Sequence, residues 1–206
     1  MSTKEERSLY PWILTEDAIR LAATLKASNT EAHKIILFTG VATQEGVSTV
    51  AAQVALALAQ MSQGSVLLLD ANLRSPSVHV IFEVPQVPGL SDVIEQKMPF
   101  HEAIHPSRHS QLSILPSGAG ENNALALFPT PECSALLQQL RQEFCFVIVD
   151  SSPLLSFVDT TLFIPYIDGI VITAAAGSHR RAEILEVKFL LDRLKANVLG
   201  VILCKK

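Results

Sequence analysis

The residues best suited to chemistry lie in a loop that follows a short apolar segment. The segment Ile35–Phe38 is continuously hydrophobic, and the chain then runs through Gly46, Ser48 and Thr49 into an apolar helical pattern. A loop that opens a helix points free backbone N–H groups, and the positive end of the helix dipole, at one place. That arrangement binds phosphate groups, and a serine at this position can hold Mg²⁺. The segment is therefore a candidate phosphate-binding loop.

Two of the four fixed positions of the phosphate-loop pattern GxxxxGK[ST] differ in this chain. Gly46 and Ser48 stand where the second glycine and the hydroxyl belong, but Val41 replaces the first glycine and Val47 replaces the lysine. In the full pattern that lysine places a positive charge on the β- and γ-phosphates. The loop is thus predicted to keep its shape and to lack its charge.

Two aspartates come directly after apolar segments. Asp70 ends the run Val66–Leu69, and Asp150 ends the run Phe146–Val149. Because open α/β sheets bind ligands at the carboxyl ends of their strands, both carboxylates are expected beside the loop. One such aspartate could equally cap a turn. Two of them together with the loop favour a site for phosphate and Mg²⁺.

The elements that would position these residues alternate along the chain. Six apolar runs are predicted as buried strands, namely Ile35–Phe38, Val66–Leu69, Leu112–Leu115, Phe146–Val149, Gly169–Thr173 and Val198–Leu203. Helical patterns cover Ser48–Met61, Pro131–Glu143 and Arg180–Leu194. The last helix is expected to bury one face made of Ile184, Val187, Leu190, Leu191 and Leu194. The proline-rich stretch Val84–Gly120 is predicted as loops and short helices. This order indicates an α/β fold with a mainly parallel sheet.

A further helix is predicted over Thr15–Ser28, before the first strand. Thr15 is a suitable N-cap, and the apolar stripe consists of Ile19, Leu21, Ala22 and Leu25. This helix is an extension that packs on the domain or on a neighbour. We expect residues 1–206 to form one domain, with residues 1–30 as its N-terminal helical extension.

Composition excludes several classes of protein. The chain has 16 Lys and Arg against 20 Asp and Glu, a net charge of −4, and this disfavours a strongly basic nucleic-acid surface. A hydrophobic fraction of 49% excludes a disordered chain. No apolar run approaches the roughly 18 residues of a membrane span and no signal peptide is evident, so we expect a cytoplasmic protein without membrane insertion. Cys133, Cys145 and Cys204 are widely spaced and are predicted to be reduced, structural thiols.

With these residues in view, the chain resembles the cytoplasmic domain of bacterial tyrosine kinases of the capsular and exopolysaccharide type, members of the MinD/ParA-like P-loop ATPases. Val66–Pro76 is similar to the family's Walker A′ segment and Val147–Pro153 to its Walker B segment. Later family segments are matched by Pro88–Ile94, Glu102–Ile104, Leu112–Gly118, Ile167–Val171 and Val198–Leu203. The resemblance implies a three-layer P-loop NTPase-like fold, in which helices flank a mainly parallel central sheet.

The resemblance also implies roles for the matched positions. Asp70 and Asp150 would be the catalytic acids, vestigial if the protein is inactive, and with Ser48 they would hold Mg²⁺. The expected contacts to ATP or ADP come from Gly46, Val47, Ser48, Thr49, Asn72 and Arg74. Asn72 stands where the family has a second acid, and an amide cannot take up a proton or add charge to a Mg²⁺ site. We therefore expect nucleotide binding to be weak or lost.

Two further family features are altered. The N-terminal oligomerisation motif, an acid and two arginines at three-residue spacing, reads Asp17, Arg20 and Ala23 here. Asp17 and Arg20 are candidate interface residues, with a solvated ion pair as the alternative, and a monomer or homodimer is expected rather than a large ring. The family's C-terminal tyrosine cluster is missing, since the chain's two tyrosines are Tyr10 and Tyr166.

Three hypotheses for function follow. The first is a pseudokinase that binds a membrane polysaccharide co-polymerase, or an active kinase, during exopolysaccharide or capsule assembly and is held at the inner membrane by that partner. The second is an active ATP-dependent kinase or ATPase in which Lys26, Lys34 or Arg74 replaces the missing lysine. The third is a MinD/ParA-like positioning ATPase. A C-terminal amphipathic helix would support this hypothesis, but no such helix is predicted from this sequence.

Two histidine-containing segments suggest other chemistry less strongly. His101, His105 and His109 have the four-residue spacing of metal ligands on a helix, but Pro106 should interrupt that helix. The basic segment Ser178–Arg181 opens the last helix. We interpret it as a solvated helix start rather than as a phosphate contact.

Overall fold

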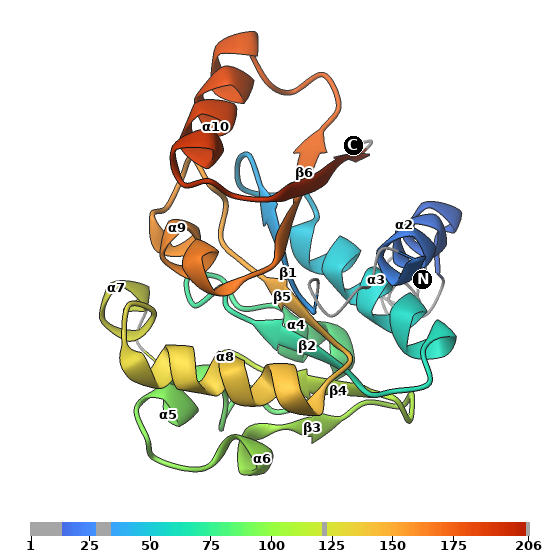
Figure 1. The fold of residues 1–206 in the computed structure, drawn as a ribbon, viewed down its shortest axis with the longest axis vertical. Helices are drawn as coiled ribbons and strands as arrows, with labels where there is room; N and C mark the ends of the chain where they lie inside the picture. The colour runs from blue at the N-terminus through green and yellow to red at the C-terminus, as the bar shows by residue number, and fades with distance from the viewer. Residues whose placement is uncertain (1–13, 28–33, 121–122, 205–206) are drawn as a thin grey trace, which may run out of the picture.

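The strands form one seven-stranded sheet with the order β3-β4-β2-β5-β1-β6-β7. The structure is a computed structural model that describes residues 14–27, 34–120 and 123–204. The strands are β1 (Ile35–Gly40), β2 (Val66–Asp70), β3 (His105–Pro106), β4 (Leu112–Leu115), β5 (Phe146–Asp150), β6 (Gly169–Ala175) and β7 (Val198–Cys204). Every neighbouring pair is parallel except β3 and β4 (Figure 1). The mainly parallel sheet expected from the sequence is confirmed.

Helices cover both faces of the sheet and complete three layers (Figure 1). The helices are α2 (Glu16–Ala27), α3 (Val47–Met61), α4 (Val78–Phe82), α5 (Leu90–Ile94), α6 (Phe100–Ala103), α7 (Ala124–Leu127), α8 (Pro131–Glu143), α9 (Asp159–Phe163), the 3₁₀ helix η1 (Ile164–Tyr166) and α10 (Arg181–Arg193). Helices α2, α3 and α4 pack on one face. The opposite face is covered by α8 together with α5, α6, α7, α9 and α10.

Alternation along the strands divides the core into two clusters. In β5, Val147 and Val149 face the cluster under α8, whereas Phe146 and Ile148 face the cluster under α3. Strands β1, β2, β5 and β6 are buried along their whole length, because helices cover both of their faces. The central strands are therefore a rigid base for whatever lies at their carboxyl ends.

The N-terminal helix α2 packs on α3. The Thr15 hydroxyl accepts the N–H of Ala18 (3.3 Å), as predicted for an N-cap, and donates to Gln53 of α3 (2.8 Å). The buried face consists of Ala18, Ala22 and Leu25. Ile19 was expected in this face but is 36% exposed, because the contact with α3 follows Ala18 instead. Residues 28–33, which include the predicted end of this helix at Ser28, lie outside the described residues.

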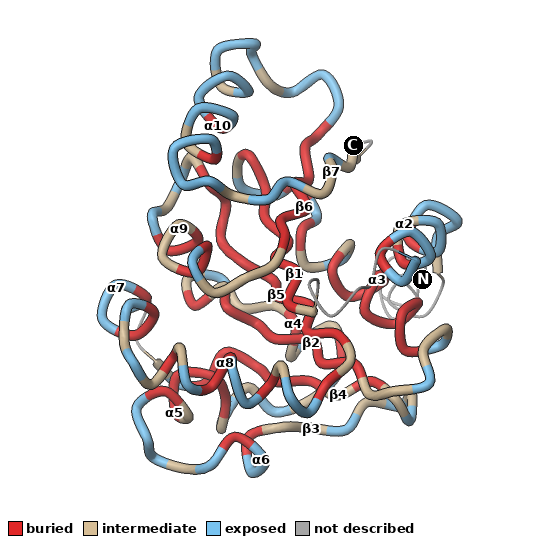
Figure 2. Tube along the Cα trace, in the orientation of Figure 1, coloured by how far each residue is buried: buried red, intermediate tan, exposed pale blue. Residues whose placement is uncertain are grey.

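The carboxyl-terminal elements are less buried than the sequence indicated. Strand β7 was predicted as a buried strand, but it is the edge of the sheet and leaves Leu203 70% exposed. Helix α10 buries Val187 and Leu191, whereas Ile184 and Leu194 are exposed, so the predicted five-residue face was too wide. Both differences have one cause: α10 and β7 lie at the margin of the sheet, with neighbours on fewer sides (Figure 2).

The short antiparallel strand β3 was not predicted. Helix α6 ends at Ala103, and His105 pairs with Ile114 of β4. His101 and His105 are therefore not on one helix.

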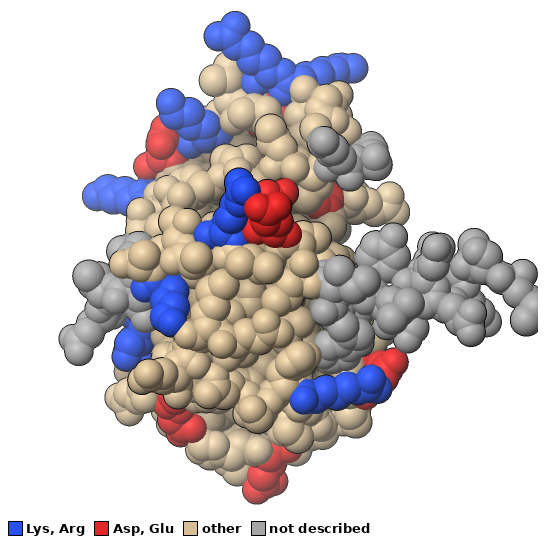
Figure 3. All heavy atoms as spheres, turned by 90° about the vertical axis from the view of Figure 1, so that its right-hand side faces the viewer, with Lys and Arg blue, Asp and Glu red and all other residues tan. Residues whose placement is uncertain are grey.

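In the described parts of the chain, no helix is long and apolar enough to cross a bilayer. On the face that Figure 3 shows, Lys and Arg are scattered among Asp and Glu around a broad uncharged area, so this face is not a basic surface.

Candidate functional site

A cavity of about 1170 Å³ opens at the carboxyl ends of β1, β2 and β5. We call residues 41–48, which comprise the link from β1 to α3 and the first two residues of α3, the phosphate loop. Gly46 precedes α3 with a positive φ of 74°, a conformation that glycine adopts without strain. The cavity is lined by residues 42–49, Ala52, Asn72, Arg74, Ser75, Ser77, Val80, Ile81, Glu83, Ser151, Pro153 and Phe157. The structure thus brings Gly46, Val47, Ser48, Thr49, Asn72 and Arg74 together at one cavity.

Asp70 and Asp150 lie side by side beneath this cavity. They are register partners at the ends of the parallel strands β2 and β5, and both residues are fully buried. Asp70 accepts three backbone N–H groups, from Asn72, Ser77 and Val78, each at 3.1 Å. Burial nevertheless raises the pKa of Asp70 to about 6. The two aspartates were predicted at this edge, and the structure places them there.

Asp150 is the less satisfied of the two carboxylates. Neither of its oxygens has a hydrogen-bond partner among the described residues. Burial, and then the charge of Asp70, raise the pKa of Asp150 well above its usual value, and the nearby Ser48 hydroxyl lowers it only in part. A buried carboxylate without a partner costs free energy unless a proton or a cation neutralises it. Oxygen ligands of this kind suit Mg²⁺, so Ser48 and Asp150, with Asp70 behind them, fit the metal that P-loop proteins use.

The lysine position contributes no charge. Val47 is 9% exposed and packs in the core cluster under α3. A Cβ atom on Gly40 would lie 3.1 Å from its Cγ2 atom, which shows how closely the valine fits against β1. Among the described residues that line the cavity, Arg74 is the only lysine or arginine.

Arg74 is already held by a buried carboxylate. Its Nε and Nη2 atoms donate to the two oxygens of Asp159 at 2.6 and 3.1 Å, and its guanidinium lies 4.6 Å from the ring centroid of Phe157. The Asp159 side chain is only 2% exposed, whereas that of Arg74 is 32% exposed. The guanidinium therefore lies in the cavity wall with its charge largely compensated.

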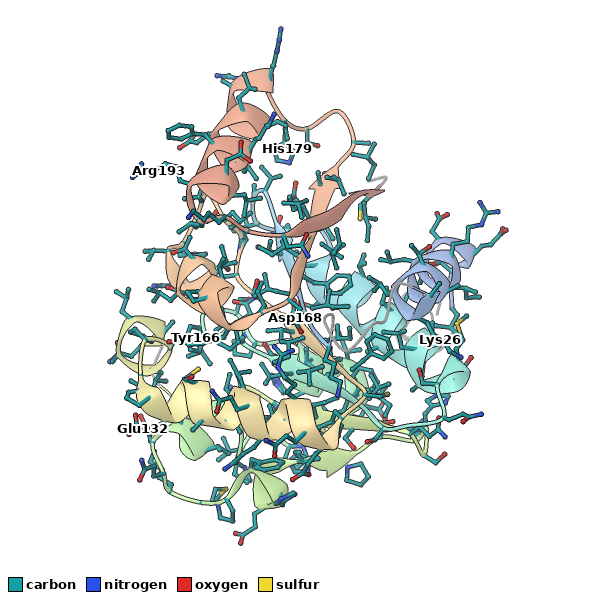
Figure 4. The ribbon with its side chains drawn as sticks, in the orientation of Figure 1. Lys26, Glu132, Tyr166, Asp168, His179 and Arg193 are labelled. Atoms are coloured by element: carbon teal, nitrogen blue, oxygen red, sulfur yellow. The ribbon has the colours of Figure 1, made fainter. Side chains whose placement is uncertain are left out.

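The two lysines proposed as replacements lie far from the phosphate loop. The Lys26 ammonium donates to the carbonyl of Met61, at the opposite end of α3 from Val47 (Figure 4). A helix of this length separates its ends by about 20 Å. Lys34 precedes β1 and so lies at the amino edge of the sheet. Neither residue supplies the missing charge.

Asn72 is oriented by its neighbours. Its Oδ1 atom accepts the backbone N–H of Ser75 (3.2 Å) and the hydroxyl of Ser152 (2.9 Å). The backbone N–H of Ser75 can donate only to the oxygen of the Asn72 amide, so this hydrogen bond fixes the orientation of the amide. The NH₂ group of Asn72 is then available to the cavity. Asn72 therefore presents a hydrogen-bond donor where the resemblance implied an acid.

Sequence reasoning missed Glu45, a buried residue of the phosphate loop, and misjudged its partner His179. His179 was expected in a solvated helix start, but its side chain is 9% exposed and its Nε2 atom contacts the Glu45 carboxylate. The two residues are 134 positions apart, so no local pattern signals the pair. The basic pattern of Ser178–Arg181 allowed a phosphate contact but favoured a solvated helix start.

The candidate interface residues Asp17 and Arg20, and Tyr166, are not among the residues that line the cavity. Arg20 pairs with Glu16 (2.6 Å) rather than with Asp17, and the side chains of that pair are 72% and 78% exposed. The interface role of Asp17 and Arg20 stays a prediction. Tyr166 is half-buried in η1, and Tyr10 lies outside the described residues.

Comparison with known proteins identifies the family. No protein-family profile matches the chain. It is, however, 30% identical over 170 residues to the tyrosine-protein kinase YwqD of Bacillus subtilis (strain 168), and the match covers 82% of this chain and 71% of YwqD. This chain belongs to the bacterial tyrosine kinase family.

Other relatives of this kinase-family chain agree. It is 27% identical over 174 residues to the tyrosine-protein kinase CpsD of Streptococcus agalactiae, covering 84% of this chain and 76% of CpsD. It is also 27% identical over 175 residues to the succinoglycan biosynthesis transport protein ExoP of Rhizobium meliloti (strain 1021), covering 84% of this chain but 22% of ExoP. The relatives thus include tyrosine kinases and a polysaccharide transport protein.

Solved structures support the same family and its fold. The VpsO kinase domain matches with a TM-score of 0.86 and 25% identity over 98% of both chains. The chimerical protein CapA2B2 matches with a TM-score of 0.85 and 27% identity over 93% of this chain and 85% of the other. The septum site-determining protein MinD of Pyrococcus horikoshii OT3, solved with Mg-ADP, has a TM-score of 0.69 at 19% identity over 83% and 69%. The P-loop NTPase fold predicted from the sequence is confirmed.

Proposed function

We propose that this family member is a pseudokinase, which binds Mg²⁺-nucleotide weakly, does not transfer phosphoryl groups, and acts as a binding or regulatory component of exopolysaccharide or capsule assembly. The asymmetry of the cavity supports the proposal. Its two carboxylates, Asp70 and Asp150, are in place, whereas Val47 occupies the lysine position and the Arg74 charge is paired with Asp159.

The physical reason is that phosphoryl transfer depends on charge. Catalysis of this reaction is mostly positioning plus electrostatic stabilisation, and each group directed at the phosphates contributes a few kcal/mol. When bound, Mg²⁺ neutralises phosphate oxygens in such sites. The residues of this chain that would hold it are Ser48 and Asp150, with Asp70 nearby. The loop N–H groups and the Asn72 amide would donate to the phosphates without adding a charge.

The proposed partner is a membrane polysaccharide co-polymerase or an active kinase of the same family. ExoP, which is named as a transport protein, contains a segment similar to this chain. CapA2B2, which this chain also resembles, is named as a chimerical protein. By analogy, the protein would be held at the inner membrane by its partner, as a single domain that is monomeric or dimeric through the α2 face that carries Asp17 and Arg20.

Calorimetry with Mg-ADP and Mg-ATP tests the nucleotide part of the proposal. We expect Val47→Lys to tighten binding of both nucleotides at least tenfold relative to the native chain, because it restores a charge directed at the phosphates. Val47→Met is the matched control, since it lengthens the side chain without charge, and should leave the affinity within threefold. No tyrosine phosphorylation or ATP turnover is expected from the native chain.

Other outcomes assign the chain differently. Turnover of ATP by the native protein that Asp150→Ala abolishes would make it an active enzyme with an unusual loop. If neither the native chain nor Val47→Lys binds nucleotide, the loop is not a phosphate site, and the family membership alone remains.

A further inference from the structure

Glu45 is a buried carboxylate inside the phosphate loop, and phosphate binding does not require it. Its side chain is 3% exposed. One oxygen accepts the N–H of Ala42 (3.0 Å), and the other accepts the N–H of Ala175 at the end of β6 (3.0 Å). A Cβ atom on Gly40 would lie 2.9 Å from Glu45 Oε2, so glycine at that position leaves room for the carboxylate. The loop is therefore folded around this charge.

His179 lies between Glu45 and a second carboxylate. Its Nε2 atom contacts Glu45, and its Nδ1 atom lies 3.3 Å from Oε2 of Glu183 on α10. Figure 4 labels His179 next to α10. Ionised carboxylates only accept hydrogen bonds, so both ring nitrogens can be satisfied at once only if both carry a proton. The geometry thus selects the imidazolium form of His179.

The charged groups around His179 favour the same form. Glu45 faces it from the phosphate loop and Glu183 from α10, and the backbone N–H of Arg180 donates to Glu183 (3.0 Å). The contact with Glu45 is the main cause of a raised pKa of His179. Burial alone would raise the pKa of Glu45, but the N–H groups of Ala42 and Ala175, followed by His179, outweigh burial and lower it.

Cys204, at the end of β7, completes this environment. Burial, and then the negative charge of Glu45, raise the pKa of its thiol, so the thiol stays protonated while the carboxylates and the imidazole titrate. Two carboxylates, Glu45 and Glu183, and the His179 imidazole are then the titrating groups at this point.

We propose that His179 is a positioning residue for the phosphate loop: its imidazolium holds Glu45, and through Glu45 the backbone of Ala42, in the phosphate-binding conformation, and it offsets the Glu45 charge beneath the bound phosphates. This inference rests on the proposed function, because it assumes that the loop receives a phosphate. It also gives a role to a histidine that contacts the loop without lining the cavity.

A pH dependence follows from the proposal. The folded protein raises the pKa of His179 above its ordinary value of 6.5 because it stabilises the cation. The imidazolium therefore holds the loop fully below pH 6.5, and this hold is lost as the pH rises through the raised pKa. Above that midpoint, neutral His179 leaves the Glu45 carboxylate uncompensated near the phosphates. Binding of a nucleotide should therefore weaken on the alkaline side of the His179 titration.

Two measurements on the full chain test this. The first is an NMR titration of the His179 ring together with the backbone amides of Ala42 and Ala175; we expect a His179 midpoint above 6.5 and the same midpoint for both amides. The second is calorimetry with Mg-ADP in the Val47→Lys background, where binding is strong enough to follow. Across the His179 midpoint we expect the affinity to fall about fivefold, a typical size for one partly screened charge.

Variants separate positioning from general stability. His179→Gln should bind Mg-ADP weakly and without this pH dependence, and Glu45→Gln, a second choice if that variant does not fold, should lower the His179 midpoint. His101→Gln is the matched control, since His101 also faces a glutamate (Glu143, 3.2 Å) but is 62% exposed on α6; its profile should equal that of the parent.

The remaining outcomes are equally informative. Amides that do not follow the His179 midpoint, or a pH profile that is unchanged in His179→Gln, overturn the proposal. If the Val47→Lys chain binds no Mg-ADP at any pH, the proposed function fails first, and the NMR titration alone then decides whether His179 controls the loop.

Discussion

The two sides of the cavity differ in how their charged groups are paired. On the acid side, formed by Asp70 and Asp150, two carboxylates share one edge of the sheet and one of them has no hydrogen-bond partner among the described residues. On the cation side, formed by Val47 and Arg74, one position has no charge and the other is paired with Asp159. The acid side is unsatisfied and needs a ligand, whereas the cation side is satisfied without one.

This difference indicates which part of the chemistry the fold still supports. An unsatisfied buried carboxylate is costly, so it persists where a bound cation uses it or where selection has not removed it. An arginine that is already paired with a buried carboxylate contributes to stability whether or not a nucleotide is present. The proposed function therefore predicts that the cavity holds a metal better than it neutralises a transferring phosphoryl group, and substitutions can test each side separately.

The largest effect is expected on the acid side, from Asp150→Asn. It removes a buried charge, so the free energy of unfolding at pH 7.5 should rise by about 2 kcal/mol. The gain should shrink toward pH 5, because the folded protein holds protons on this pair more tightly than the unfolded chain does. The protons bound to Asp70 and Asp150 stabilise the folded protein at low pH. This stabilisation is lost as the pH rises from 3.8, the ordinary pKa of an aspartate, through the Asp70 pKa of about 6 and beyond.

Urea denaturation at several pH values, without Mg²⁺, measures this effect. Asp192→Asn is the matched control, because Asp192 is exposed on α10, and it should change stability by less than about 0.5 kcal/mol. An Asp150→Asn variant that is destabilised equally at pH 5 and 7.5 would show that the carboxylate is structural and that the acid side is satisfied after all.

The contrast between the two sides also shows what a sequence can reveal. Asp70 and Asp150 were predictable because each ends an apolar strand, and strand ends are set by local hydrophobicity and by the rules of parallel sheets. The pairing of Arg74 was not, because Asp159 is 85 residues away and its approach depends on how α9 packs. Partners that are distant in sequence leave no spacing to detect.

The edge of the sheet shows the same limit for the fold. The apolar run in β7 has the composition of a buried strand, and so does the run in β5. Only the strand order makes β5 central and leaves Leu203 of β7 exposed. Hydrophobicity therefore predicts that each strand exists, but how deeply a strand is buried depends on its place in the strand order.

On the cation side, Arg74→Met should lower the free energy of unfolding by about 1.5 kcal/mol, since it leaves the buried Asp159 carboxylate without its two strong hydrogen bonds. Adding Asp159→Asn should recover much of that loss. Because the guanidinium is already paired, Arg74→Met should change the affinity for Mg-ADP less than threefold.

A double-mutant cycle of Arg74→Met and Asp159→Asn in urea measures the changes in the free energy of unfolding. Calorimetry measures the change in Mg-ADP affinity. Arg20→Met is the matched control, because the exposed pair with Glu16 should contribute no more than about 0.5 kcal/mol. A loss of more than tenfold in Mg-ADP affinity on Arg74→Met would contradict the comparison, since Arg74 would then supply the charge that Val47 lacks.

The smallest effect is expected where the two sides meet, at the contact between Ser152 and Asn72. Ser152→Ala removes one hydrogen bond of a neutral pair and should cost about 1 kcal/mol, equally at pH 5 and pH 8 because neither group titrates. The backbone N–H of Ser75 still fixes the Asn72 amide in this variant, so Mg-ADP affinity should change less than twofold. Ser156→Ala, at an exposed position, is the control for the serine side chain itself. A larger loss of affinity would mean that Ser152, rather than Ser75, sets the donor that Asn72 offers to the cavity.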